Sequence, residues 1–196
     1  MKITEYTKKY NIPDAQPIKP QSKMAKLAEA IFDWITSVVI AVIFLCFVFT
    51  FIVRPVKVDG DSMLPTLQDG NWLIVSAFDT DPQQGEIVII TQPNETEKGG
   101  PVVKRVIAVG GQTVDIDFEN GIVYVDDEAL DEPYIKDKTH RSFDVEFPLT
   151  VPDGYLFVMG DNRNNSLDSR STKIGLIDER YVLGSYLFKA YPFGNK

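Results

Sequence analysis

Residues 35–53 read ITSVVIAVIFLCFVFTFIV, a run with no charged side chain and only Thr36, Ser37 and Thr50 as polar residues. A helix of this length matches the ~30 Å hydrocarbon core of a bilayer, because each helical residue rises ~1.5 Å. The run is apolar on every face, unlike the amphipathic helix of a soluble core. It therefore predicts a transmembrane helix and divides the chain of 196 residues into three parts.

The flanks of this run argue against a cleavable signal peptide and suggest an orientation. A long segment precedes it, and Val53-Arg54-Pro55 follows where a small-residue cleavage site would stand. Residues 1–34 carry six lysines and four acidic residues, and a short basic arm stays inside whereas long domains translocate regardless of charge. We expect residues 1–34 to be a cytoplasmic polar arm and 35–53 a single span of the cell membrane. Residues 54–196 would then be an extracytoplasmic domain.

Composition limits what this outer domain does. Residues 54–196 carry 14 basic and 24 acidic residues, a net charge of −10 that would repel nucleic-acid phosphates. The only cysteine, Cys46, lies inside the apolar run, and the only histidine is His140. The domain is therefore not expected to hold a zinc site or a cysteine nucleophile, and no cofactor is implied.

The outer domain has a β-type sequence pattern. Short runs rich in valine, isoleucine and aromatic residues alternate with Gly, Pro, Asn and Asp, and helical periodicity is nearly absent. We predict a mostly β fold: one transmembrane helix followed by an all-β domain, barrel-like or a folded sheet. The expected strands are Val56–Val58, Trp72–Ala77, Glu86–Thr91, Val102–Val109, Thr113–Asp117, Ile122–Val125, Phe143–Phe147, Tyr155–Met159 and Tyr181–Ala190.

A candidate nucleophile lies just beyond the span. Ser62 stands in Asp59-Gly-Asp-Ser-Met-Leu-Pro-Thr66, between a glycine that permits unusual backbone angles and a proline that fixes the chain. A turn serine that bonds its own backbone is the simpler interpretation of this segment. To act as a nucleophile, the hydroxyl needs a base.

Two bases are available to Ser62. His140 lies between Thr139 and Arg141 in a polar stretch, which does not favour the protected site of a Ser-His-acid triad. Lys104 instead lies in the apolar run 101–109, where burial would lower its pKa, although an edge-strand lysine is an equally good interpretation. No serine has a lysine three positions later, which excludes the β-lactamase motif.

A third polar segment, residues 160–170, reads GDNRNNSLDSR. It is too polar for a core and is either a solvated loop or a network that positions catalytic groups.

Together, these segments resemble type I signal peptidases, the membrane-anchored Ser-Lys endopeptidases that remove signal peptides from exported proteins. The similar stretches, in family order behind one span, are GDSMLPT at 60–66, GEIV at 85–88, VKRV at 103–106 and GDNR at 160–163 with the residues up to Gly175.

The resemblance implies a role for each matching residue. Ser62 would be the nucleophile, Lys104 the general base, and Ser166 a hydrogen-bonding partner that orients the lysine. Asp168 and Arg170 would form a supporting ion pair, and Asp161 with Arg163 would brace the same network. The resemblance also implies small residues at the first and third positions before the cut. The expected substrate-binding residues are Val56, Val58, Met63 and Val103, with Val56–Val58 pairing with the substrate as an added strand.

The chain departs from the family pattern at Gly60, where many members carry a serine whose hydroxyl helps to bind the oxyanion. The Ser62 backbone N–H and Gly60 are the expected oxyanion candidates. The expected partners are signal-peptide-bearing preproteins, the lipid bilayer and the protein-export machinery. Two alternatives remain: a self-cleaving repressor-type peptidase, and an inactive membrane-tethered β module that binds exported proteins.

Overall fold

The computed structural model describes residues 22–76, 81–91 and 100–191. Most of the predicted arm 1–34, and Ala77 at the end of one expected strand, lie outside these residues. The chain separates into two units, residues 1–45 and 46–196, which are considered individually.

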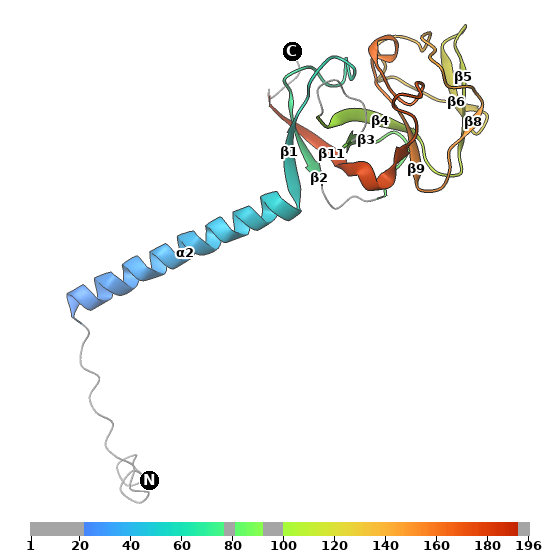
Figure 1. Ribbon diagram of the computed structural model, residues 1–196. Helices are drawn as coiled ribbons and strands as arrows, with labels where there is room; N and C mark the ends of the chain where they lie inside the picture. Colours follow the sequence, from blue (N-terminus) through green and yellow to red (C-terminus); the bar gives the residue numbers. More distant parts are fainter. Residues whose placement is uncertain (1–21, 77–80, 92–99, 192–196) are drawn as a thin grey trace, which may run out of the picture. The chain divides into compact units, whose positions relative to one another are not determined.

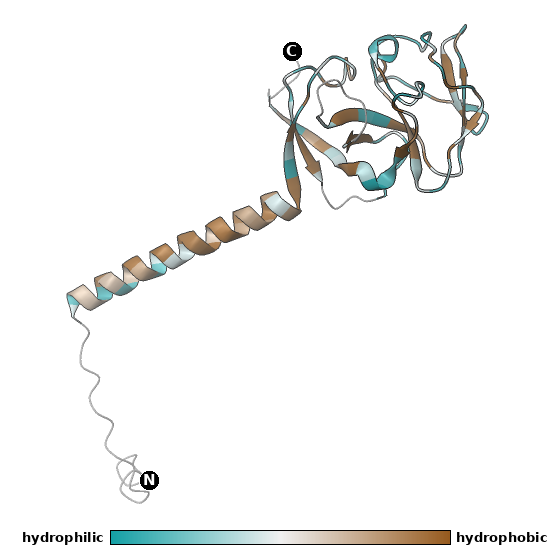
Figure 2. Cartoon of the chain, viewed as in Figure 1, coloured by the Kyte–Doolittle hydropathy of each residue, from teal (hydrophilic) through white to brown (hydrophobic). Residues whose placement is uncertain are grey.

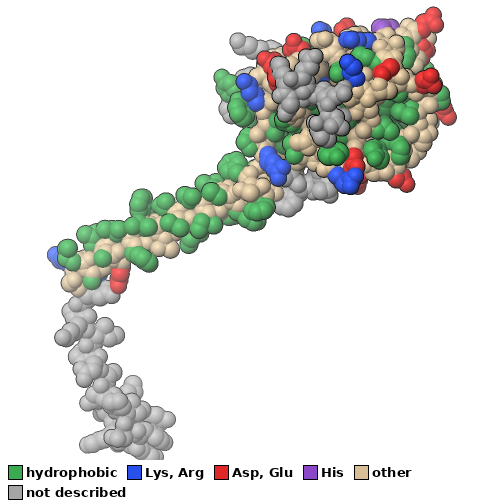
Figure 3. All heavy atoms as spheres, viewed as in Figure 1, with side chains coloured by type: hydrophobic (Ala, Val, Ile, Leu, Met, Phe, Trp, Pro, Cys, Tyr) green, Lys and Arg blue, Asp and Glu red, His purple; other side chains and the backbone are tan. Residues whose placement is uncertain are grey.

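Helix α2, Lys23–Phe51, contains most of the predicted span (Figure 1). It is apolar along most of its length, and hydrophobic side chains cover its visible face (Figures 2 and 3). Its few hydroxyl groups bond within the helix: Thr36 Oγ1 donates to the Phe32 carbonyl and Ser37 Oγ to the Asp33 carbonyl, both at 2.8 Å. Among the residues described, this is the only helix long and apolar enough to cross a membrane.

The boundaries of α2 differ from the predicted ones. The helix begins at Lys23, well before Ile35, and ends at Phe51. Val53 starts strand β1, Val53–Lys57, where it pairs with Ser76. Pro55 lies in this strand and has no backbone N–H for a helical hydrogen bond, which explains why the chain leaves the helix before it.

The β-rich unit contains two antiparallel sheets, and its mostly β character confirms the predicted fold class (Figure 1). The larger sheet has the order β1-β2-β11-β3-β4-β9-β10, and the smaller has the order β7-β6-β5-β8. The remaining bounds are β2 Trp72–Ser76, β3 Ile87–Ile90, β4 Val102–Ala108, β5 Thr113–Asp117, β6 Ile122–Val125, β7 Glu128–Ala129, β8 Leu149–Thr150, β9 Tyr155–Met159, β10 Ile177–Asp178 and β11 Val182–Tyr191. Short 3-10 helices cover Arg163–Asn165 and Glu179–Tyr181.

One predicted strand, Phe143–Phe147, is wrong. The backbone of this segment bonds to a loop instead of a neighbouring strand: Val145 N–H donates to the Arg170 carbonyl at 3.2 Å. The two-residue strands β7, β8 and β10 were not predicted, because two residues are too few to show alternation.

Strand β4 contributes to all three hydrophobic clusters of the domain. Val103 packs in the cluster built on Leu73 and Val75, Val106 in a second with Leu156, and Ile107 in a third with the small sheet. Six of its seven residues are buried, so both faces of β4 are covered. Polar side chains on this strand are therefore forced away from water.

Candidate active site

The turn that carries Ser62 follows β1 and is anchored from below. Met63 and Leu67 are both 1% exposed and pack into the core, while Ser62 remains partly accessible. Gly60 has a φ of 92°, a conformation that side chains of L-residues rarely adopt. The turn therefore holds the Ser62 hydroxyl in a defined position beside Lys104, the proposed base.

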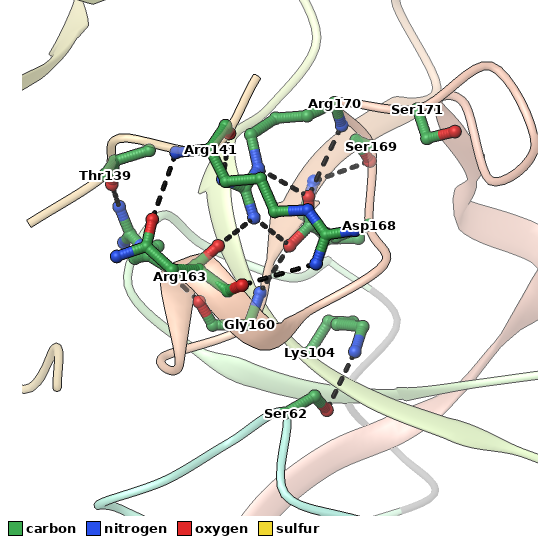
Figure 4. Close-up of polar contacts among 12 residues, drawn as sticks. Ser62, Lys104, Thr139, Arg141, Gly160, Arg163, Asp168, Ser169, Arg170 and Ser171 are labelled. Atoms are coloured by element: carbon green, nitrogen blue, oxygen red, sulfur yellow. Dashed lines mark hydrogen bonds and ion pairs between the residues drawn. The ribbon is translucent and has the colours of Figure 1, made fainter. Parts of the chain in front are cut away.

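Lys104 lies opposite this serine on β4 (Figure 4). It is only 5% exposed, and its Nζ donates a hydrogen bond to Ser62 Oγ at 2.9 Å. Burial lowers the pKa of Lys104 from 10.5 to about 8, because the ammonium group loses its hydration. Asp168 opposes this shift, Arg170 adds to the lowering, and Asp161 raises the pKa slightly. A lysine of this kind exchanges its proton near neutral pH.

The loop 160–171 closes over these two residues through a buried ion pair. Arg170 Nε donates to Asp168 Oδ1 at 2.8 Å, and both side chains are fully buried. Asp168 also accepts the Gly160 N–H at 3.1 Å, and Arg170 donates to the carbonyls of Arg163 and Arg141 (Figure 4). Asp168, the carboxylate with the largest effect on the pKa of Lys104, is therefore held in place by hydrogen bonds from Arg170 and Gly160.

Asp161 and Arg163 belong to the same network, but each pairs with a residue from a different segment of the chain and not with the other. Asp161 receives two hydrogen bonds from Arg105, at 2.8 and 2.6 Å. Arg163 pairs with Glu132 at 2.5 Å. Arg105 and Glu132, which are far apart in the chain, thus form the ion pairs with Asp161 and Arg163 that hold this network together.

Ser166 differs from its expected arrangement. Its Oγ is buried and has no hydrogen-bond partner among the residues described, so it does not contact Lys104 in this conformation. A Cβ at Gly160 would collide with this hydroxyl and with the Ser62 carbonyl oxygen.

The two expected oxyanion donors differ in whether their N–H groups already form a hydrogen bond. The Gly60 N–H already donates to Asp69 Oδ1 at 2.9 Å, so this group is engaged and Gly60 is corrected as a donor. The Ser62 N–H bonds to no other group within the described residues.

The expected substrate-contacting side chains are mostly packed in the core. Val58, Met63 and Val103 are at most 7% exposed and join one hydrophobic cluster, with Val56 partly buried against it. These side chains follow their strands inward, because apolar burial against Leu73 and Val75 is favourable. They form the floor beneath the site and do not line its opening.

An open cleft of about 790 Å³ contains both Ser62 and Lys104. Its lining also includes Lys57 at the end of β1, Asp59 and Gly60 in the turn that follows, Pro101 and Val102 before Lys104, and Leu167, Lys173, Ile174 and Ile177. Figure 4 shows Ser62 and Lys104 pointing toward each other beneath the loop 160–171.

His140 takes no part in this arrangement. It is exposed, its Nδ1 lies 3.0 Å from the Phe118 carbonyl oxygen, and its N–H donates to Asn164. Within the described ranges, no group of three or more His, Cys, Asp and Glu side chains is placed to hold a metal ion. The geometry therefore pairs Ser62 with Lys104 and not with an imidazole.

Sequence reasoning missed several residues that contact the site. Asn162 donates its N–H to the Ser62 carbonyl at 2.9 Å and its Nδ2 to the Asp61 carbonyl at 3.0 Å. Thr66 Oγ1 donates to Asp161 Oδ2 at 2.5 Å. Thr66, Arg105 and Asn162 all lie in the stretches GDSMLPT, VKRV and GDNR, but the sequence predicted no role for any of them.

Comparison with known proteins identifies the chain as a peptidase, since residues 31–191 match the profile of a peptidase family. The chain belongs to the family described as signal peptidase, peptidase S26. It is 34% identical to signal peptidase I of Bacillus licheniformis, over 88% of this chain and 95% of that protein. It is also 34% identical to signal peptidase I S of Bacillus subtilis (strain 168), over 88% and 96%.

A third relative has a higher sequence identity over a shorter alignment. The probable signal peptidase I-1 of Synechocystis is 39% identical over 72% of this chain and 73% of that protein. A crystal structure of a signal peptidase I from Enterococcus faecalis aligns with 54% of this chain and 96% of that chain, at 28% identity and a TM-score of 0.44. The comparisons confirm the family that the motifs resembled.

Proposed function

We propose that this protein is a membrane-anchored serine endopeptidase that removes signal peptides from exported preproteins with a Ser62–Lys104 pair. The observation that carries the proposal is the 2.9 Å contact between Lys104 Nζ and Ser62 Oγ, made by a lysine that burial keeps partly neutral. In the neutral lysine the hydrogen bond reverses, and the hydroxyl donates to the amine lone pair. A general base must lie within this reach of the proton that it abstracts.

The reaction then follows in two stages. Neutral Lys104 takes the Ser62 proton as Oγ attacks the carbonyl carbon of the last signal-peptide residue. The resulting lysinium gives this proton to the leaving amine, which departs with the mature chain. Lys104 next deprotonates a water that attacks the acyl-enzyme, and the proton returns to Ser62 Oγ as the signal peptide is released.

Backbone and neighbouring groups support this chemistry. The Ser62 N–H, which has no other partner among the described residues, would donate to the oxyanion. The buried Asp168–Arg170 pair would hold the charge around Lys104 constant. The Ser166 hydroxyl, without a partner in the described part of the chain, is available to orient Lys104 when a substrate is bound.

Substrate binding is proposed at β1, which forms one edge of the larger sheet. An extended signal-peptide end would add to this edge as a strand, with main-chain hydrogen bonds holding it over Ser62. Shallow apolar pockets along this edge would accept the small side chains of Ala-x-Ala-type junctions. Helix α2 would hold the enzyme in the bilayer with residues 1–34 cytoplasmic and the β domain outside, beside the export machinery that delivers its substrates.

The test is cleavage of a preprotein with an Ala-x-Ala junction by the full-length protein in detergent–lipid micelles, beside Ser62→Ala and Lys104→Ala. Cutting after the second alanine by the wild type, lost in both folded variants, is expected. Undiminished cutting by Lys104→Ala would place the base elsewhere. No cutting and no acylation of Ser62 by a serine-directed probe would leave the tethered binding module.

A further inference from the structure

Residues 132–141, here called the strap, lie between β7 and β8 and belong to none of the motifs that resemble the family. The strap has no helix or strand. Three of its side chains, those of Glu132, Tyr134 and Thr139, nevertheless contact arginines of the active-site network. These contacts point to a role for the strap in the active-site network.

Tyr134 covers the face of the Arg105 guanidinium, with the ring centroid 3.9 Å from Cζ. The edge of the same guanidinium is filled by Asp161 and by the Gly85 carbonyl, which accepts from Nη1 at 2.7 Å. An arginine that is bonded at its edge and stacked on its face has little freedom to move. Tyr134 therefore fixes Arg105, the residue next to Lys104.

Asp161 carries this constraint to the nucleophile turn. Its Oδ2 accepts from Arg105 and from Thr66, so one carboxylate joins β4 to the segment that bears Ser62. The adjacent Asn162 binds the carbonyls of Ser62 and Asp61. The base strand and the nucleophile turn, 42 residues apart at Lys104 and Ser62, are thus linked through this loop.

Glu132 holds the other side of the loop. Its carboxylate accepts from both terminal nitrogens of Arg163, at 2.5 and 3.1 Å, and Thr139 Oγ1 accepts a further bond from Nη1 at 3.0 Å. Arg163 in turn donates from Nε to the Gly160 carbonyl at 3.0 Å. The strap therefore contacts both Arg105, the partner of Asp161, and Arg163, the residue that follows Asn162.

Resting on the proposed function, we propose that Tyr134 and Glu132 are positioning residues that set the Ser62–Lys104 geometry through Arg105 and Arg163. Burial raises the pKa of Tyr134 to about 12, so its ring stays neutral and attractive to Arg105 over the working pH range. Replacing the ring admits water to the Arg105 face, weakens the pair with Asp161, and lets the nucleophile turn shift. Displacements of about 1 Å at a reacting pair cost on the order of 100-fold in rate.

The experiment compares Tyr134→Leu with Tyr134→Phe in the full-length enzyme in micelles, after wild-type cleavage and its loss in Ser62→Ala have established the proposed function. Tyr134→Leu is expected to lower kcat roughly 10- to 100-fold with KM nearly unchanged, and Tyr134→Phe, which keeps the ring, to restore it. Tyr124→Leu, a partly buried tyrosine of the small sheet, is the matched control for loss of a ring. Equal effects in Tyr134→Leu and Tyr124→Leu, or no rescue by phenylalanine, would overturn the proposal.

Two further measurements keep the proposal testable if a variant is poorly stable or the substrate is wrong. Combining Tyr134→Leu with Thr66→Val should give a loss in kcat smaller than the product of the single losses, because both act through Asp161; full additivity would contradict the link. A crystal structure of Tyr134→Leu needs no turnover. It should show Lys104 Nζ and Ser62 Oγ farther apart than 2.9 Å, and an unchanged separation would reject the idea.

Discussion

At the residue scale, the central feature is a lysine placed where a charge is unfavourable. Lys104 has little exposed surface, and within the described residues its amine bonds to the Ser62 hydroxyl. Removing an ammonium from water disfavours its charged form, and the two nearby carboxylates offset this only in part. The same burial that destabilises the folded chain lowers the pKa of the proposed base toward neutral pH.

The pH dependence of cleavage follows from this pKa. With a pKa of about 8, Lys104 is protonated at acidic pH and becomes neutral as pH rises through that value. We expect kcat/KM to increase by about tenfold per pH unit below the pKa and to level off above it. Steady-state cleavage between about pH 5 and 9 measures the profile. A flat profile would contradict Lys104 as the base.

Replacing this lysine should increase the stability of the fold although it abolishes cleavage. The folded pKa of about 8 lies below the unfolded one of 10.5, so the unfolded chain binds more protons between these values. Wild-type stability therefore falls as pH drops from about 10.5 to about 8 and stays reduced at lower pH. Lys104→Met is therefore expected to raise the free energy of unfolding at pH 7 by roughly 1–3 kcal/mol while abolishing cleavage. Denaturant unfolding in micelles measures it. The advantage should shrink toward pH 10, and a constant difference would exclude the titration as its cause.

Gly160 makes a second prediction at this scale. A Cβ there would meet the Ser62 carbonyl oxygen and the Ser166 side chain, and the first of these is backbone. Gly160→Ala is expected to reduce cleavage by at least about 100-fold because the nucleophile turn must shift. Gly100→Ala, where added atoms meet open space, serves as the control. Near-normal activity in Gly160→Ala would show that the turn adapts.

At the element scale, β4 explains why two neighbouring basic residues do different work. Alternation along the strand sends Lys104 toward Ser62 and Arg105 toward Asp161, and both faces are buried. One face of β4 carries Lys104, the proposed proton acceptor, and the other carries Arg105, which forms the ion pair with Asp161. A one-residue slip of β4 against β3 would exchange the two roles, so the pairing of Lys104 with Val88 is part of the catalytic design.

The open edge of β1 makes a prediction about substrates. If the signal-peptide end adds to this edge as a strand, every second backbone N–H of the substrate faces β1. Peptides methylated on those alternate nitrogens are expected to raise KM at least about fivefold, and peptides methylated at the intervening positions much less. A methylation scan of one peptide measures both sets. Equal effects at all positions would argue against strand addition.

At the scale of the whole molecule, the chain combines an apolar helix with an acidic β domain. Helix α2 has no buried residue, so its side chains need an apolar environment from outside the chain. Ile43→Arg together with Phe47→Arg should weaken membrane retention, since a charge at a helix centre costs ~2.5–3.5 kcal/mol per residue. Alkaline carbonate extraction of membranes measures retention, with Ser37→Leu as the apolar control. Full retention of the doubly charged variant would contradict a spanning role.

The sequence alone determined the apolar helix, the mostly β character of the remainder and the family. Long apolar runs, period-two alternation and contiguous motifs are local, and local patterns are readable without coordinates. Its errors were also local: the helix end near Val53 and the false strand at Phe143–Phe147, where apolar residues bond to a loop.

Only the tertiary structure decided which residues meet. The pairs of Asp161 with Arg105 and of Arg163 with Glu132, and the stacking of Tyr134 on Arg105, join segments far apart in the chain. The Ser62–Lys104 pair was implied by the resemblance, and the structure supplies its 2.9 Å contact. Such contacts depend on strand register and on the burial of both faces of β4. These properties arise from the packing of the whole domain, and no short stretch of sequence contains them.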